Sequence, residues 1–451
     1  MNTIPIIQMI IAALIAILIY TFIGFIPGTD ETSVLMPITL TVILSGVQPV
    51  VVLTFFIAAI VTLNLINAIP TALVGLPGGV MSSPMMEYSL FLKDRGMSAM
   101  VIKKMAVGSL IGTFISIPSS LVLANILAPY AKNIQVLAPL LFFLGAIFLS
   151  LIGKNKILSI LSILPLSILF MGLRHLYWGI GIVPQDKNIT VSFFLGITIG
   201  PLIVSLFSIL NKTSRKNSIT ESMKEIIIPG NAAINTLNPL KILTKQEIRA
   251  ASISAFIVNF LFVLSPVGLT ILLGEANANR VEDPVKRANT AITTMNAVAQ
   301  ATYLSGIIIP LIAVGIPLSP VAIGPGSALF NAPPVFTVDN NLHHLLGRWE
   351  FVLAILTGAI TAIVITYYIT NRFASKISTF VLKRIPHEAI LSLFIAFILL
   401  LSYMDAGLIN VFGVILIGIT CGALNKMGVS YGVQFMTLYA APWIIGKMAL
   451  I

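Results

Sequence analysis

The sequence contains little charge and almost no cysteine. Only 9% of its 451 residues are charged, whereas 57% are hydrophobic and the mean hydropathy is +1.04. Soluble domains carry charge on about a quarter of their residues, so this composition excludes an ordinary soluble protein. The single cysteine, Cys421, excludes an intrachain disulfide and a cysteine-based metal cluster. The composition predicts an all-α polytopic protein of the cell membrane, without a separate soluble domain.

Acidic residues are scarcer than basic ones, which gives a formal net charge of +11. The basic residues lie in short connections between apolar runs and form no stripe with interleaved aromatics, so we expect no nucleic-acid partner. They gather at 93–104, 212–249 and 372–384, and the positive-inside rule places all three clusters on the cytoplasmic side. The apolar segment 6–26 has neither a preceding Lys or Arg nor a cleavage pattern, which is typical of a retained first helix rather than a signal peptide.

One pattern occurs twice in the chain. Residues 69–77 read IPTALVGLP, and 240 residues later residues 309–317 read IPLIAVGIP. Each copy has two prolines around a glycine, which remove backbone donors and tolerate unusual dihedral angles. Such a segment must be buried in protein or line a water-filled cavity, and paired interruptions in two halves of a membrane protein indicate a transport site. We therefore expect two internal repeats, each with a broken or re-entrant helix. The number of spans, and with it the inversion of the second half, stays open at this point.

The longest polar connection divides the chain near its midpoint. It covers 211–249 and holds seven Lys and Arg residues. We expect an N-terminal membrane repeat over 1–210, a polar cytoplasmic connection over 211–249 and a C-terminal membrane repeat over 250–451. Apolar runs predict membrane spans at 6–26, 49–67, 106–127, 136–152, 157–182, 191–210, 250–273, 350–369, 389–403, 408–424 and 431–450.

Glycine and polar residues around the two copies form the candidate site. Half-helix N-termini present N–H groups to an anion, and unwound carbonyls face a cation. We expect an anionic substrate to bind at Gly75, Pro77, Gly78, Gly79, Ser82 and Ser83 in the first half, and at Gly315, Pro317, Ser319, Gly324, Gly326 and Ser327 in the second. The candidates for coupling an ion are Asn64, Asn67, Thr71, Thr302 and Ser305 with the carboxylates of Asp30 and Glu31. No cofactor or resident metal is expected, and the coupling ion is Na⁺ or H⁺.

Several of these features also have a structural interpretation. Pro and Gly are common in membrane helices, and Ser and Thr join helices by hydrogen bonds, but two matching copies favour a site. The carboxylates of Asp30 and Glu31 follow a Pro-Gly pair at a span end, where a solvated loop is the commoner outcome.

Other polar residues in the apolar runs have simpler interpretations than a site. Arg174-His175 lies beside aromatic residues that fit an interfacial belt with a snorkelling arginine. Asp405 is typical of a turn between two spans. His343-His344 has no third ligand nearby, and adjacent histidines lie on different faces of a helix, which favours a loop over a metal site.

Four stretches, in order along the chain, resemble a known family. They are GFIPG at 24–28, GLPG at 75–78 followed by KDRG at 93–96, NTAITTMNAVAQ at 289–300 leading into IIIPLIAVGIPLSPVAIGPGSALF, and YMDAG with FGV and GALNKMGVSYG at 403–432. In these four stretches the chain resembles the large membrane subunit of the tripartite tricarboxylate transporters, the TctA-like permeases. The resemblance implies an inverted-repeat secondary transporter that imports organic carboxylates on an ion gradient. It implies a small membrane subunit and an extracytoplasmic solute-binding protein as partners, and we also expect contacts with membrane lipid and a homodimer.

Two other classes stay open on the sequence. An intramembrane enzyme acting on a lipid-linked substrate needs a reactive motif, and the G-x-S-x-G match at 428–432 lies between two apolar spans without the strand-to-helix turn that this motif requires. A passive anion channel favours a filter repeated across an oligomer, whereas this repeat lies within one chain. We therefore predict a secondary active transporter, not an enzyme, that imports small tricarboxylate-like organic anions with Na⁺ or H⁺.

Overall fold

The computed structural model describes residues 5–26, 31–74, 78–152, 155–183, 190–210, 237–384 and 387–449. Within these ranges the regular structure is helical, and β pairing is confined to two isolated bridges, Ala332 with Phe336 and Thr337 with Asn340. Seven of the described helical segments are long and apolar enough to cross a membrane, by length and composition. The predicted all-α polytopic class is confirmed. The two inverted repeats and the division at 211–249 stay predictions.

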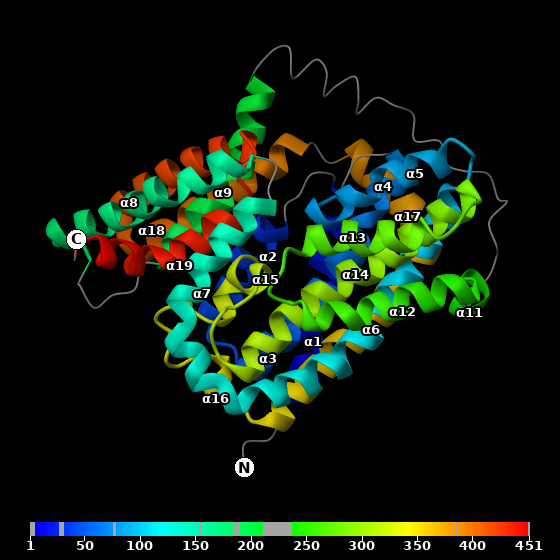
Figure 1. The fold of residues 1–451 in the computed structure, drawn as a ribbon, viewed down its shortest axis with the longest axis horizontal. Helices are drawn as coiled ribbons and strands as arrows, with labels where there is room; N and C mark the ends of the chain where they lie inside the picture. The colour runs from blue at the N-terminus through cyan, green and yellow to red at the C-terminus, as the bar shows by residue number, and fades with distance from the viewer. Residues whose placement is uncertain are drawn as a thin grey trace.

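The helices form a larger and a smaller bundle (Figure 1). The larger bundle contains α1 (Ile6–Gly24), α3 (Pro49–Ile66), α4 (Ala68–Val74), α5 (Met86–Lys93), α6 (Ser98–Leu127), α11 (Pro239–Ile242), α12 (Lys245–Phe260), α13 (Pro266–Ala278), α14 (Pro284–Ala313) and α17 (Arg348–Arg384). The smaller bundle contains α7 (Ala131–Ile152), α8 (Lys156–Gly179), α9 (Thr190–Leu210), α18 (His387–Lys426) and α19 (Tyr431–Met448). Each bundle therefore takes helices from both halves of the sequence.

Short elements connect the two bundles. Helix α2 (Glu31–Leu44) contacts α3 in the larger bundle, α9 and α18 in the smaller one, and the 3-10 helix η3 (Ser327–Leu329). Helix α15 (Pro320–Ile323) contacts α14 on one side and α19 on the other. We call α2, α15 and η3 the junction. The remaining described elements are η1 (Val80–Met85), η2 (Ala128–Tyr130) and α16 (Leu342–Leu345).

Two of the seven spanning segments are almost completely buried. These segments are Pro49–Leu73, which joins α3 to α4, and α14. In each of them 94% of the most apolar 18-residue stretch is buried inside the protein, whereas the share is 28–39% in the other five. A helix that is apolar on all sides, as α3 is, needs either lipid or protein around it, and here it has protein. Helix α14 instead carries buried polar side chains along its length, such as Asn296 and Gln300. These two central helices lead into the two copies of the repeated pattern.

Glycine pairs allow two helix crossings to reach backbone contact. A Cβ at Gly422 of α18 would lie 2.7 Å from the carbonyl oxygen of Gly200 in α9. A Cβ at Gly112 of α6 would lie 2.4 Å from the carbonyl oxygen of Ala297 in α14. Each of these glycines has a second glycine four residues away on the same helix, which is the spacing that brings membrane helices close together.

Residues 250–273, predicted to form one span, instead form the two arms of a helical hairpin. The arms α12 and α13 have 16 and 13 residues. These lengths correspond to roughly 24 and 20 Å, which is less than the ~30 Å of the hydrocarbon layer. Ser265 and Pro266 start the second arm, because the Ser265 hydroxyl accepts the N–H of Gly268 at 3.3 Å and proline is suited to the first helical position. The single-span prediction was therefore wrong.

Helix α18 bends sharply between the spans predicted at 389–403 and 408–424. Ala406 and Gly407 leave the helical region, with φ values of −149° and 70°. The side-chain amide of Asn410 donates to the carbonyl of Ser402 at 2.8 Å. Along a straight helix these residues would be separated by roughly 12 Å, so the chain turns back at this point.

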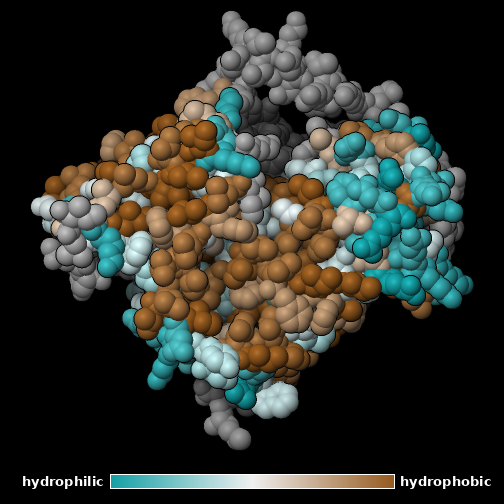
Figure 2. Space-filling model, viewed as in Figure 1, coloured by the Kyte–Doolittle hydropathy of each residue, from teal (hydrophilic) through white to brown (hydrophobic). Residues whose placement is uncertain are grey.

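Hydrophilic side chains gather at opposite edges of a broad hydrophobic surface (Figure 2). One such edge lies over α5 and α13, at the upper right of the view. The start of α6, in the basic cluster 93–104, is joined to the start of α12 by an ion pair between Lys104 and Glu247 at 2.5 Å. Basic residues of both segments therefore lie at the same side of the protein, which the positive-inside rule identifies as cytoplasmic.

Candidate functional site

The first turn of α2 places a buried carboxylate against the first copy of the repeated pattern. Glu31 is 1% exposed. Its Oε2 accepts the N–H of Val80 at 3.2 Å, and its Oε1 accepts the N–H of Met81 at 3.3 Å. The side-chain amide of Asn67 donates to Oε1 at 3.4 Å. The backbone after the first copy thus already holds a carboxylate with the N–H groups at the start of η1.

Glycines 78 and 79 make this close approach possible. A Cβ at Gly79 would lie 2.2 Å from Oε1 of Glu31 and 2.6 Å from the amide nitrogen of Asn67. A Cβ at Gly78 would lie 2.1 Å from the carbonyl oxygen of Asn67. Gly79 has an extended backbone with φ of −147°, so lack of space rather than backbone strain excludes a side chain there.

Serines 82 and 83 fold back onto the same glycine. The Ser82 hydroxyl accepts the N–H of Gly79 at 3.1 Å and lies 2.9 Å from its carbonyl oxygen, to which it can donate. The Ser83 hydroxyl donates to that carbonyl at 3.4 Å. The predicted residues Gly78, Gly79, Ser82, Ser83, Asn67 and Glu31 are therefore brought together. Asp30, Gly75 and Pro77 lie outside the described residues.

Three predicted ion ligands share one face of α3 and α4. Asn64, Asn67 and Thr71 are spaced by three and four residues, which places their side chains on the same helical face. They are 8%, 2% and 0% exposed. Within the described part of the chain, the amide oxygens of both asparagines and the hydroxyl of Thr71 have no hydrogen-bond partner. Buried polar atoms are normally paired, and hard cations prefer oxygen ligands, so this face next to Glu31 fits a bound cation.

The second copy ends a membrane helix. Pro310 lies in the last turns of α14, the helix stops at Ala313, and Gly315 adopts φ of 77° in the left-handed region that favours glycine. The side-chain amide of Asn341 donates to the Gly315 carbonyl at 2.8 Å. The ring of His343 packs on Gly315, where a Cβ would lie 2.8 Å from an imidazole carbon. Pro317 follows in a non-helical stretch before α15.

Residues after the second copy build the junction. The Ser319 hydroxyl accepts the N–H of Ala322 at 3.0 Å and donates to the Gly306 carbonyl at 2.6 Å, which ties α15 to α14. The hydroxyl of Ser327 is buried, and the described residues offer it no hydrogen-bond partner. Gly326 packs on Ile307 of α14, whose side chain would lie 2.2 Å from an added Cβ.

The first turn of α2 contacts the candidate binding residues of both halves of the chain. Glu31 binds the segment after the first copy, as described above. A Cβ at Gly324, after the second copy, would lie 3.4 Å from the Thr32 hydroxyl oxygen. The next residue, Ser33, donates to the carbonyl of Thr198 in α9 at 2.7 Å. Three successive residues of α2 therefore connect the first copy, the second copy and the smaller bundle.

The model of one protein family, described as the tripartite tricarboxylate transporter TctA family, matches residues 10–434. The chain belongs to this family. Comparisons with curated proteins and with solved structures gave no match. TctA-family membership makes this chain a multi-pass membrane subunit of a transporter of the plasma membrane and not an enzyme. A tripartite transporter has further subunits, including a substrate-binding protein, and takes a small anion. The expected homodimer and lipid contacts stay predictions.

Two predicted ion ligands of this TctA-family chain direct their hydroxyls into their own helix. Thr302 lies 2.9 Å from the carbonyls of both Val298 and Ala299, and Ser305 donates to the Thr302 carbonyl at 3.4 Å. Such bonds are common for Ser and Thr inside helices. Gln300 was not among the predicted ligands, but it is 0% exposed and its side-chain nitrogen and oxygen have no partner within the described residues. Its position in a run of polar residues within a central apolar region was the available signal.

The remaining polar candidates of the TctA-family chain have structural partners. Arg174 donates to the Thr190 hydroxyl at 3.0 Å and lies 5.9 Å from the ring of Trp178. Asp405 accepts a hydrogen bond from the Ser192 hydroxyl at the bend of α18. Nδ1 of His343 lies 3.0 Å from the Leu311 carbonyl, and burial lowers the pKa of this imidazole.

Proposed function

We propose that this TctA-family chain is the permease of a secondary active transporter that imports small, tricarboxylate-like organic anions, and that the substrate binds at the junction. The contact of the first turn of α2 with the segments after both copies carries the proposal. Binding sites are commonly built where two rigid units meet, and transporters favour broken segments near the middle of the membrane. The described site offers backbone N–H groups, glycines and hydroxyls to a carboxylate.

The hydrogen bonds of the Glu31 carboxylate suggest a mechanism that couples cation binding to anion binding. Its carboxylate occupies the N–H groups of Val80 and Met81, which are the donors that a substrate carboxylate needs. A proton or a Na⁺ ion that neutralises Glu31 weakens its hydrogen bonds and releases these donors. The oxygens of Asn64, Asn67 and Thr71, which have no hydrogen-bond partner among the described residues, are the further ligands that we assign to Na⁺. The cation then favours anion binding without a deep cationic side chain.

The test is uptake into proteoliposomes that contain the chain with its membrane partner and the substrate-binding protein. Labelled mono-, di- and tricarboxylates are offered under an imposed Na⁺ or proton gradient. We expect saturable, gradient-dependent uptake, and faster exchange when unlabelled substrate is present inside the liposomes. Uptake that neither saturates nor shows this counterflow would indicate a channel and would refute the proposal.

The variant Glu31→Gln tests the coupling step. It keeps the size of the side chain but removes both the negative charge and the proton site. We expect gradient-driven accumulation to be lost, whereas exchange of labelled for unlabelled substrate continues and no longer depends on the cation. The control Glu282→Gln alters an exposed carboxylate and leaves both activities unchanged. Unaltered cation dependence in Glu31→Gln would exclude Glu31 from coupling.

A further inference from the structure

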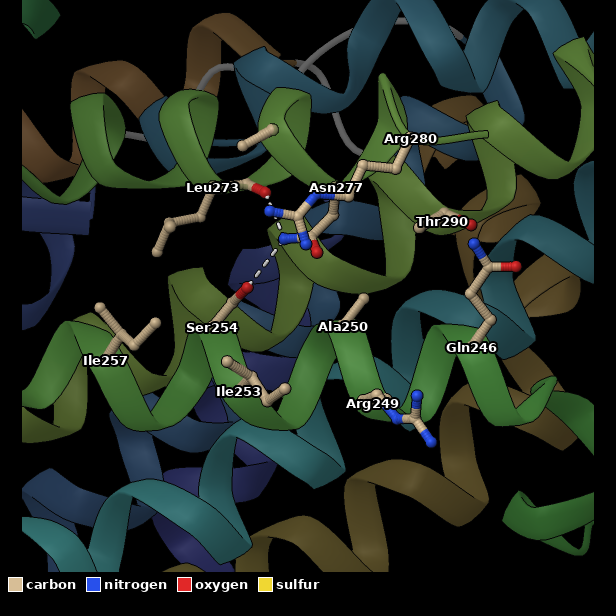
Figure 3. A pocket seen from close by; sticks show the side chains of 11 residues that line it. Gln246, Arg249, Ala250, Ile253, Ser254, Ile257, Leu273, Asn277, Arg280 and Thr290 are labelled. Atoms are coloured by element: carbon tan, nitrogen blue, oxygen red, sulfur yellow. Dashed lines mark hydrogen bonds between the residues drawn. The ribbon is translucent and has the colours of Figure 1, made fainter. Parts of the chain in front are cut away.

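A cavity of about 230 Å³ lies between the arms of the α12–α13 hairpin (Figure 3). Its lining includes Arg249 from α12 and Arg280 from the turn that follows α13. The side-chain amide of Asn277 donates to the Ser254 hydroxyl at 3.0 Å and so joins the two arms. In Figure 3 the Arg280 side chain runs back along α13 toward Asn277 and Ser254. The cavity therefore has a positively charged, hydrogen-bonding part.

The two guanidinium groups lie where an external anion can reach them. Arg249 and Arg280 are both exposed. The one ion pair between described residues joins Lys104 to Glu247, so neither arginine is paired with a carboxylate in that part of the chain. A guanidinium group binds phosphate with two parallel hydrogen bonds, so one arginine can hold a phosphate ester and the second adds attraction for its charge.

The part of the cavity nearer the tip of the hairpin is lined by apolar side chains that are exposed at the surface of the protein. Ile253 and Ile257 line it and are 53% and 39% exposed. They lie one turn apart on α12, so they form a strip that runs from Arg249 toward the tip of the hairpin. The arms start and end on the cytoplasmic side, because Lys104 and Glu247 join α12 to the basic start of α6. The charged part of the cavity is thus at the headgroup level and the apolar strip extends into the hydrocarbon.

We propose that an anionic phospholipid of the cytoplasmic leaflet binds between the arms of the hairpin. Its phosphate binds Arg249 and Arg280, and one acyl chain lies along Ile253 and Ile257. A soluble phosphate ester would use the charged part alone and would leave the apolar strip exposed, so the combination selects an amphiphile. Basic pockets between membrane helices on the cytoplasmic side are suited to such headgroups. The site is separate from the junction and does not depend on the proposed transport mechanism.

Native mass spectrometry of the full chain in detergent tests this proposal. Phosphatidylglycerol, phosphatidylcholine and glycerol 3-phosphate are titrated separately, and bound adducts are counted. We expect phosphatidylglycerol to bind most tightly. The double variant Arg249→Gln/Arg280→Gln should weaken its binding on the order of tenfold or more, because each basic side chain contributes to the attraction of an anionic headgroup. The control Lys241→Gln/Lys286→Gln removes the same charge from exposed positions outside the cavity and should have little effect.

Two results would overturn the site. Equal weakening in both double variants would mean that general surface charge attracts the lipid. Glycerol 3-phosphate binding as tightly as phosphatidylglycerol would mean that the apolar strip takes no part. A third variant, Ile253→Ser/Ile257→Ser, should weaken phosphatidylglycerol binding and leave any binding of glycerol 3-phosphate unchanged. Because all four positions are exposed, each variant is expected to fold, and an unchanged unfolding temperature verifies this.

Discussion

The contact between Gly79 and Glu31 gives a prediction that tests the geometry of the site directly. In Gly79→Ala the new methyl group would lie 2.2 Å from Oε1 of Glu31 and 2.6 Å from the amide nitrogen of Asn67. Ordinary contacts need more than 3 Å, so the carboxylate must move away by about an ångström. That movement breaks its hydrogen bonds to the N–H groups of Val80 and Met81, which are 3.2 and 3.3 Å long.

The expected cost follows from these two bonds. A hydrogen bond to a charged group contributes about 1.5–3 kcal/mol, and bonds of this length belong at the lower end of that range. We therefore expect Gly79→Ala to lower the free energy of unfolding by about 3 kcal/mol. The control Gly172→Ala lies in α8, where an added Cβ meets no atom of the described residues within 4 Å. It should not destabilise the protein, because alanine is favoured over glycine inside a helix by up to ~1 kcal/mol.

Cys421 provides the assay. It is the single cysteine of the chain and is 0% exposed, so a fluorogenic maleimide reports unfolding without any added label. We expect Gly79→Ala to be labelled at a lower temperature than the native protein. The double variant Gly79→Ala/Glu31→Asp should recover part of the loss, because the shorter side chain withdraws the carboxylate from the new methyl group. Native-like stability of Gly79→Ala, or no recovery in the double variant, would refute the described packing of Glu31 on Gly79.

Two further predictions concern regions away from the junction. Lys104→Met should lower the free energy of unfolding by about 3–5 kcal/mol, because Lys104 and Glu247 are 6% and 3% exposed and the substitution leaves a buried carboxylate without its cation. In the same assay the double variant Lys104→Met/Glu247→Met should be less destabilised than Lys104→Met. An equal loss of stability in both variants would contradict the buried ion pair. Burial lowers the pKa of His343, so the native protein should lose stability as the pH falls through about 6.5, where this histidine is protonated more readily in the unfolded chain. His343→Asn should reduce that pH dependence in unfolding temperatures measured from pH 5 to 8, whereas the same change at exposed His344 should preserve it.

Composition was enough to predict the class of the fold, but apolar length was a poor guide to two elements. The run 250–273 is long enough for one span, yet Ser265 and Pro266 begin a second helix within it. Their capping pattern was visible in the sequence. Helix α14 was not predicted as a span, because the second copy of the pattern was expected to break the helix there, and its hydropathy of 1.4 is the lowest of the seven spans. Hydropathy measures suitability for lipid, and α14 is surrounded by protein instead.

The candidate site shows a similar division between local and tertiary information. The glycines and serines after the first copy were selected from the Pro/Gly pattern, and Glu31 was selected because a carboxylate at membrane depth is costly. The sequence offered no means of pairing Glu31 with Gly79, because that contact depends on how α2 folds back onto the first copy. Thr302 and Ser305 were selected for their oxygen atoms, but these atoms bond to helix carbonyls that are not visible in a sequence.

The central position of both copies follows from the polarity of the chain. An apolar helix that carries polar side chains along its length, as α14 does, is costly in hydrocarbon, so it must be enclosed by other helices. In its most apolar 18-residue stretch, 94% is buried. Helix α3 is enclosed to the same extent and brings Asn64 with it. Each of these helices continues into a proline and glycine segment whose freed backbone groups also need protein or water around them. Enclosing both helices therefore brings the described segments that follow the two copies toward the interior, where the single first turn of α2 reaches both.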